Sequence, residues 1–156
     1  MTREMTAGET VRAVVLGVVL IGATVVANVV AMRHVEHLSS VGSDPWLERW
    51  VIGTAAALAL LSVVCGIAVL RATAPWNLAL TLPLLTGPIV GISSYVTWSA
   101  MGLTDAHSAA CEQAQACDVS FGFGAAALSV IASIGLGAAW LAGYGAKRFL
   151  TRPAGS

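Results

Sequence analysis

Hydrophobic residues in this chain are gathered into four long stretches that contain no Asp, Glu, Lys or Arg. The stretches cover residues 13–32, 51–70, 77–101 and 119–146, and every formal charge lies between them or near the chain ends. A helix needs about 20 uncharged, mainly apolar residues to cross the ~30 Å hydrocarbon core of a bilayer. The pattern therefore predicts an all-α integral membrane protein with four transmembrane helices.

The connections between the stretches predict how the helices follow one another. Residues 71–76 separate the second stretch from the third, so these two helices are expected to be antiparallel neighbours, with Pro75 at the start of the third. Connections of this kind favour an up-down-up-down four-helix bundle. Residues 1–156 then form a single membrane domain, with residues 33–50 and 102–118 as two loops on one side.

The overall composition supports the same class. Hydrophobic residues make up 57% of the chain and charged residues 10%, and the mean hydropathy is +0.82, well outside the range of soluble globular domains. Because the net charge is zero, no nucleic-acid partner is expected. Heavy use of Ala, Val and Gly, with Arg used in preference to Lys, suggests a bacterial gene of high GC content, and hence a multi-pass protein of the bacterial plasma membrane.

The distribution of charge predicts the orientation. If the spans alternate, one side carries Arg33 and Arg49, and the other carries six basic residues: Arg3, Arg12, Arg71, Lys147, Arg148 and Arg152. Because basic residues favour the cytoplasm, both termini are predicted to be cytoplasmic and the two loops extracytoplasmic.

Aromatic residues near the ends of the stretches suit this orientation. Three are expected near the outer membrane boundary: Trp46, Trp50 and Trp98. Three others are expected near the inner boundary: Trp76, Trp140 and Tyr144. Such a distribution is typical of the aromatic belts at the two membrane interfaces.

Small residues recur at helical spacing in the third and fourth stretches. The third contains Gly87 and Gly91, and the fourth contains Ser129, Ser133 and Gly137. Small residues let helix backbones approach closely in lipid, where the hydrophobic effect drives little association. The spacing favours packing of these helices against one another, and the alternative is that one such face binds a partner protein.

The third stretch is the most polar of the four. It contains Pro83 and Pro88, which remove backbone hydrogen bonds and tend to kink a helix. It also contains a set of hydroxyl-bearing residues: Thr86, Ser93, Ser94, Tyr95 and Thr97. One interpretation is a kinked helix that lines a cavity for a lipid, quinone or solute. The favoured one is a central helix whose hydroxyls bond to their own backbone.

Two cysteines lie in the second predicted outer loop. Cys111 and Cys117 flank a short segment, and in an oxidising compartment they are expected to form a disulfide that constrains the loop. The alternative is a thiol-redox enzyme. Against it, the chain contains no CxxC, and the third cysteine, Cys65, lies in mid-span, where a buried inert thiol is expected.

The histidines form the other candidate constellation. His34 and His37 share a helix face if the first helix continues past residue 32, and His107 in the other outer loop could complete a metal site. A single HxxH is a weak signal for metal binding. Solvated histidines at the level of the lipid headgroups are the favoured interpretation.

No motif in the chain indicates catalysis. Nucleophile-elbow, Walker, HExxH and nucleotide-binding patterns are absent, no cofactor is expected, and no ionisable residue inside the predicted spans marks a proton or ion path. We therefore expect a non-catalytic accessory subunit whose partners are other integral membrane proteins of a transporter or respiratory assembly. One alternative is a small transporter, channel, or lipid- or quinone-binding bundle that uses the third span. Another is an extracytoplasmic thiol-redox or metal-dependent enzyme.

Overall fold

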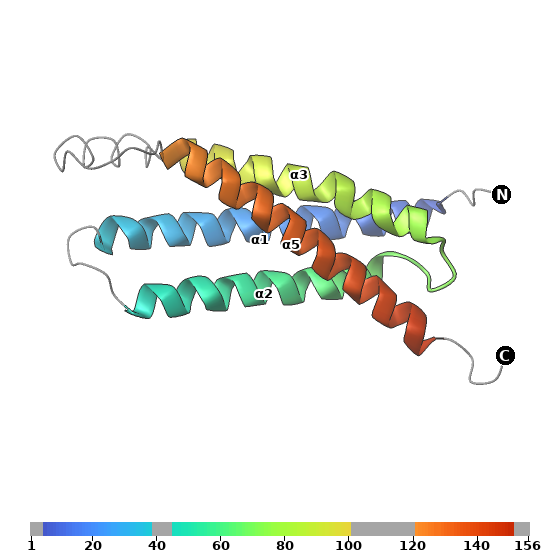
Figure 1. Ribbon diagram of the computed structural model, residues 1–156. Helices are drawn as coiled ribbons and strands as arrows, with labels where there is room; N and C mark the ends of the chain where they lie inside the picture. The colour runs from blue at the N-terminus through green and yellow to red at the C-terminus, as the bar shows by residue number, and fades with distance from the viewer. Residues whose placement is uncertain (1–4, 39–44, 101–120, 152–156) are drawn as a thin grey trace.

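The computed structural model describes residues 5–38, 45–100 and 121–151 (Figure 1). These residues form four long helices, α1 (Ala7–Leu38), α2 (Pro45–Val69), α3 (Trp76–Ala100) and α5 (Phe121–Leu150). For the described residues the prediction of an all-α protein is confirmed. Within this described part of the chain, three helices are long and apolar enough to cross a membrane, over Ala7–Ala31, Ile52–Val69 and Trp76–Thr97.

The first helix begins earlier than the charge-free stretch predicts, because Thr6 caps it. The Thr6 backbone N–H donates to Glu9 Oε2 at 3.1 Å, and the Glu9 backbone N–H donates to Thr6 Oγ1 at 3.4 Å. This reciprocal pair is a capping box, which satisfies two backbone donors at the helix start. The helix therefore extends to Ala7, beyond the predicted boundary at residue 13.

The helices are arranged so that α1 and α5 lie between α2 and α3 (Figure 1). The α5 helix packs against α2 and α3, and α1 packs against the same two helices from the other side. The expectation that the second and third helices are neighbours is wrong over most of their length, since each of them packs mainly on α1 and α5. A short connection constrains only the helix ends that it joins.

The start of α1, the connection between α2 and α3, and the end of α5 meet at one end of the bundle. Arg71 Nε lies 3.9 Å from Glu9 Oε1, and Lys147 Nζ donates to the Leu70 carbonyl at 2.6 Å. We refer to this region, residues 5–12, 70–76 and 144–151, as the Arg71 end. Thus α1 and α3 begin at the Arg71 end, whereas α2 and α5 end there.

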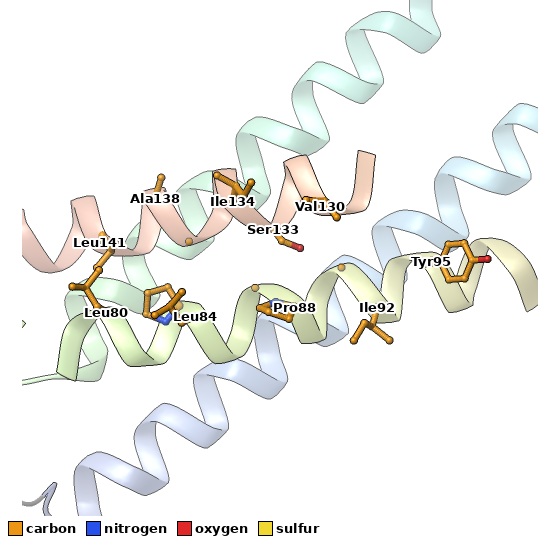
Figure 2. Close-up of a pocket in the computed structure, with 14 residues that line it drawn as sticks. Leu80, Leu84, Pro88, Ile92, Tyr95, Val130, Ser133, Ile134, Ala138 and Leu141 are labelled. Carbon is orange, nitrogen blue, oxygen red and sulfur yellow. The ribbon is translucent and has the colours of Figure 1, made fainter. Parts of the chain in front are cut away.

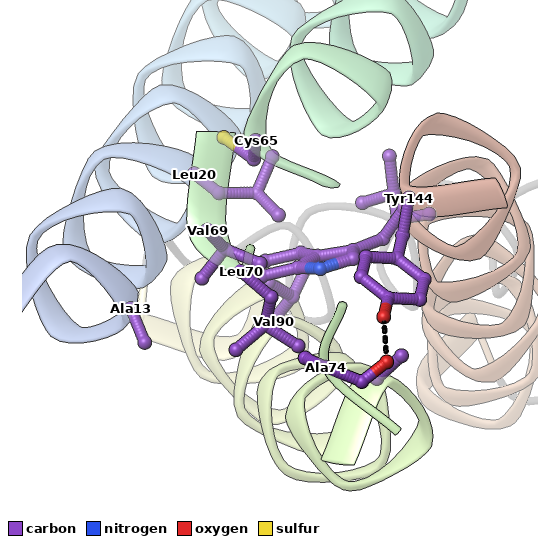
Figure 3. Packing of buried hydrophobic residues seen from close by; sticks show 11 residues of the cluster. Ala13, Leu20, Cys65, Val69, Leu70, Ala74, Val90 and Tyr144 are labelled. Carbon is purple, nitrogen blue, oxygen red and sulfur yellow. Dashed lines mark hydrogen bonds between the residues drawn. The ribbon is translucent and has the colours of Figure 1, made fainter. Parts of the chain in front are cut away.

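The buried core extends from the middle of the bundle to the Arg71 end. Its largest fully buried side chains come from all four helices and from Leu70 directly after α2: Leu20, Ser62, Cys65, Val69, Leu70, Val90, Trp140 and Tyr144. Figure 3 shows the Tyr144 hydroxyl donating a hydrogen bond to the Ala74 carbonyl in this region. Cys65 is free and buried, as predicted.

Two of the aromatic residues assigned to the inner membrane boundary are core residues instead. Trp140 is 1% exposed and Tyr144 is 0% exposed, whereas Trp76 is 47% exposed. A belt residue must present its ring to the lipid headgroups. The belt prediction is therefore wrong for Trp140 and Tyr144, whose rings fill the space between helices.

The α2 and α5 helices cross in direct backbone contact. A Cβ atom added at Gly66 would overlap the Trp140 carbonyl, and one added at Gly143 would overlap the Val63 carbonyl. Each helix therefore contributes one glycine at the point where the other helix's backbone approaches. This crossing sets the position of α5, and with it the surface that α5 shares with α3.

Candidate functional site

An apolar groove of about 680 Å³ runs between α3 and α5. Figure 2 shows Leu80 and Leu141 at one end of the groove and Tyr95 toward the other. The lining residues are glycine, proline, alanine and larger aliphatic residues, except for Tyr95 and Ser133. Leu84 and Ile134 among them are each 68% exposed, so the groove opens on the outside of the bundle.

Small residues bring α3 and α5 together beneath this groove. A Cβ atom at Gly87 would lie 3.3 Å from the Ser133 carbonyl oxygen, and one at Gly137 would lie 3.5 Å from the Pro83 Cβ. Three of the predicted helix-packing residues thus face the neighbouring helix inside the bundle. Gly91, the fourth, is buried and lines the groove.

Hydroxyl groups of α3 bond to the backbone of their own helix. Thr86 Oγ1 donates to the Leu82 carbonyl at 2.9 Å, Ser93 Oγ to the Val90 carbonyl at 2.9 Å, and Thr97 Oγ1 to the Ser93 carbonyl at 2.7 Å. The favoured interpretation of the third stretch, with hydroxyls bonded to their own backbone, describes these three residues. Their hydroxyls are thereby engaged within the helix.

The other two residues of the polar set differ in position. Ser94 is buried and is not among the groove-lining residues, whereas Tyr95 is 42% exposed and lines the groove. The groove consequently presents hydrocarbon along most of its length. Such a surface suits an acyl chain better than a polar solute, whose hydrogen-bonding groups would find few partners there.

Aromatic and basic side chains gather beside the groove at the Arg71 end. The Trp76 and Tyr144 rings meet edge to face, with centroids 5.2 Å apart and an interplanar angle of 85°. The guanidinium carbon of Arg148 lies 5.4 Å from the Trp76 ring centroid, which is a cation–π distance. Gly145 leaves room for this arrangement, because a Cβ atom there would lie 3.4 Å from the Trp76 ring.

The remaining predicted site residues have side chains outside the described part of the chain. The α1 helix does continue past residue 32, so the backbone positions of His34 and His37 lie three apart on one helix, as the metal hypothesis requires. The others are Cys111, Cys117, His107 and Ser129. Within the described residues, no group of three or more His, Cys, Asp or Glu side chains is placed to hold a metal ion.

Sequence interpretation missed the residues that shape the groove and its basic end. Ile134 and Ala138 are ordinary aliphatic residues in an apolar helix, and no local signal distinguishes them. A signal does exist for Trp140, Tyr144 and Arg148, since their spacing of four places them on one side of a helix. The prediction that Trp140 and Tyr144 are separate membrane-belt residues did not take account of the helix face that they share with Arg148.

The described residues thus form an apolar groove with one aromatic and basic end. Its walls come from α3 and α5, and α2 sets the position of α5 through the glycine crossing. No protein-family model, curated protein or solved structure matches the chain.

Proposed function

We propose that this protein is a non-catalytic accessory subunit of a larger plasma-membrane assembly, such as a transporter or respiratory complex. It would cross the bacterial plasma membrane four times as an up-down-up-down bundle, with α5 as the fourth span and both termini in the cytoplasm. In that orientation the Arg71 end lies at the cytoplasmic face, where basic residues are favoured.

The observation that carries this proposal is a stripe of exposed valines along α1. Each is between 44% and 63% exposed, and they are Val11, Val14, Val15, Val18, Val19, Val26 and Val30. Gly22 lies at the centre of the stripe, and a Cβ atom there would meet nothing within 4 Å. The buried residues Ala13, Leu20 and Thr24 lie on the opposite side of the helix.

A valine stripe with a central glycine suits a transmembrane helix of another protein. Valine in a helix has one dominant χ1 rotamer, so the stripe loses little conformational entropy when a partner packs on it. Gly22 permits close approach of the partner's backbone. By contrast, Gly66, Gly87 and Gly143 face neighbouring helices of the bundle itself.

Site-specific photocrosslinking in the native membrane tests this proposal. A benzophenone side chain replaces Val18 in the stripe, and the matched control carries it at Leu60, which is 66% exposed on α2. We expect a discrete adduct between the Val18 position and one subunit of a complex that also co-purifies with the unmodified chain in a fixed ratio. Adducts with lipid alone, with a second copy of this chain, or equally from both positions would overturn the proposal.

A lipid-binding bundle is the second candidate function, and the groove between α3 and α5 favours it. The groove and the valine stripe lie on different helices, so the two functions are compatible. A thiol-redox or metal-dependent enzyme remains a hypothesis that depends on five residues whose side chains the structure does not describe: Cys111, Cys117, His34, His37 and His107.

A further inference from the structure

We propose that the groove between α3 and α5 holds an acyl chain of an anionic phospholipid, whose phosphate lies against Arg148 at the Arg71 end. This inference rests on the second candidate function, lipid binding in this groove, and it is independent of the accessory-subunit proposal, which concerns the exposed valines of α1.

The groove is longer than the hydrocarbon layer of one leaflet of a bilayer. Its lining runs along α3 from Leu80 to Tyr95, which corresponds to about 22 Å at the helical rise of ~1.5 Å per residue. Half of the hydrocarbon core of a bilayer is about 15 Å thick. An acyl chain that starts at the Arg71 end can therefore follow the groove to the middle of the membrane.

The lining of the groove suits a hydrocarbon chain. Apart from Tyr95 and Ser133, its side chains are aliphatic, or the residues are proline or glycine. A chain of methylene groups needs no hydrogen-bond partner, so it can lie along such a surface without an unsatisfied polar group.

The Arg71 end carries an excess of positive charge for an anionic headgroup. Its described basic residues are Arg12, Arg71, Lys147 and Arg148, whereas Glu9 is the one carboxylate among the described side chains. Glu9 Oε1 forms an ion pair with Arg71 Nε at 3.9 Å. Nη1 of Arg148 is buried and has no hydrogen-bond partner in the described part of the chain.

Arg148 lies at the place where a headgroup would leave the groove. The groove-lining face of α5 continues toward the helix end at steps of three and four, through Ile134, Ala138, Leu141, Gly145 and Arg148. On α3, Trp76 lies one helical turn before Leu80, and Arg148 lies over its ring. A guanidinium binds phosphate oxygens through charge-assisted hydrogen bonds, and tryptophan favours the membrane interface.

Matched variants separate the acyl-chain site from the headgroup site. Ala138→Phe fills the groove from an exposed position, and Ala132→Phe adds the same ring at an exposed position of α5 outside the groove. Arg148→Gln removes the charge beside the groove, and Arg12→Gln removes one from α1 at the same end of the bundle. Circular-dichroism melting of each variant in detergent shows whether it is folded before binding is compared.

The experiment reconstitutes the full chain in nanodiscs of phosphatidylglycerol and phosphatidylcholine with identical acyl chains. Native mass spectrometry after mild extraction then counts the lipids retained by each chain. We expect one retained lipid, with phosphatidylglycerol preferred about fivefold. Ala138→Phe should lower retention about tenfold, whereas Ala132→Phe should change it by less than about twofold. Arg148→Gln should abolish the preference, and Arg12→Gln should leave it.

Several outcomes would overturn the proposal. The first is equal lipid retention in the Ala138→Phe and Ala132→Phe variants. The second is a preference for phosphatidylglycerol that survives Arg148→Gln. The third is saturable binding of inorganic phosphate to the lipid-free chain that competes with the lipid.

A second measurement uses only the wild-type chain. Phosphatidylglycerol with a diazirine on its acyl chain should label α3 and α5 peptides, and equal labelling of α1 would contradict the groove as the site.

Discussion

The Ser62 hydroxyl in α2 donates a 2.6 Å hydrogen bond to the Leu136 carbonyl in α5. Ser62 is 0% exposed and Leu136 is 8% exposed, so this polar contact is enclosed by the bundle. It lies one turn from Gly66, where the α2 and α5 backbones touch. The hydrogen bond and the backbone contact together fix α5 against α2.

We expect Ser62→Ala to lower the free energy of unfolding by about 1 kcal/mol, the usual value for a hydrogen bond between transmembrane helices. Ser93→Ala is the matched control, because the Ser93 hydroxyl bonds within its own helix, and it should change the free energy much less. Denaturation in mixed dodecyl-sulfate micelles measures both variants. Equal effects would show that the bond to Leu136 contributes nothing beyond an ordinary intrahelical one.

Gly66→Ala should be more damaging, because its new Cβ would overlap the Trp140 backbone carbonyl, which cannot move without shifting α5. Overpacking of this kind destabilises by about 3 kcal/mol or more when backbone must shift. Gly135→Ala serves as control, since a Cβ there meets nothing within 4 Å. The same denaturation assay compares them, and a Gly66→Ala variant as stable as Gly135→Ala would contradict the observed crossing.

The positions of the helices could be predicted from the chain, because long charge-free stretches are required by the hydrocarbon core. The start of α1 was also readable, since Thr6 and Glu9 have the spacing of a capping box. The arrangement of the helices was not. Each helix is apolar on every side, so no polar face indicates which surface turns outward, and the separation of α2 from α3 depends on tight local fits such as Gly66 against Trp140.

The candidate site was also predictable only in part, because its shape depends on how the helices fit against one another. Gly87, Ser133 and Gly137 were recognisable as packing residues because small side chains at helical spacing are typical of contacts between transmembrane helices. The groove beside them depends on the crossing angle of α3 and α5, which no residue pattern specifies. Arg148 belongs to the site because it lies over Trp76, a contact between residues far apart in the chain.

Tyr144→Phe tests the anchoring of α5 at the Arg71 end. The variant removes the hydrogen bond from the Tyr144 hydroxyl to the Ala74 carbonyl and keeps the edge-to-face contact with Trp76. It also leaves a buried carbonyl without this donor, so we expect a loss of about 1 kcal/mol in unfolding free energy. Tyr95→Phe, at an exposed side chain, should have little effect. Comparable losses in the two variants would argue against this anchor.

Gly22→Leu tests the proposed contact between α1 and a partner helix. The new side chain projects from the centre of the valine stripe into space that is open in the bundle, so the isolated protein should fold normally. A partner backbone packed on Gly22 would be displaced by the leucine. Gly53→Leu is the matched control, because Gly53 is an exposed glycine of α2 that is equally open. Native mass spectrometry of extracts made in mild detergent measures assembly. The wild-type and Gly53→Leu chains should both be found in the complex. The amount of Gly22→Leu chain in the complex should fall about tenfold, which corresponds to about 1.4 kcal/mol of association free energy. Undiminished assembly of the Gly22→Leu chain would exclude the valine stripe as the interface, because a helix packed there could not accommodate a leucine at its point of closest approach.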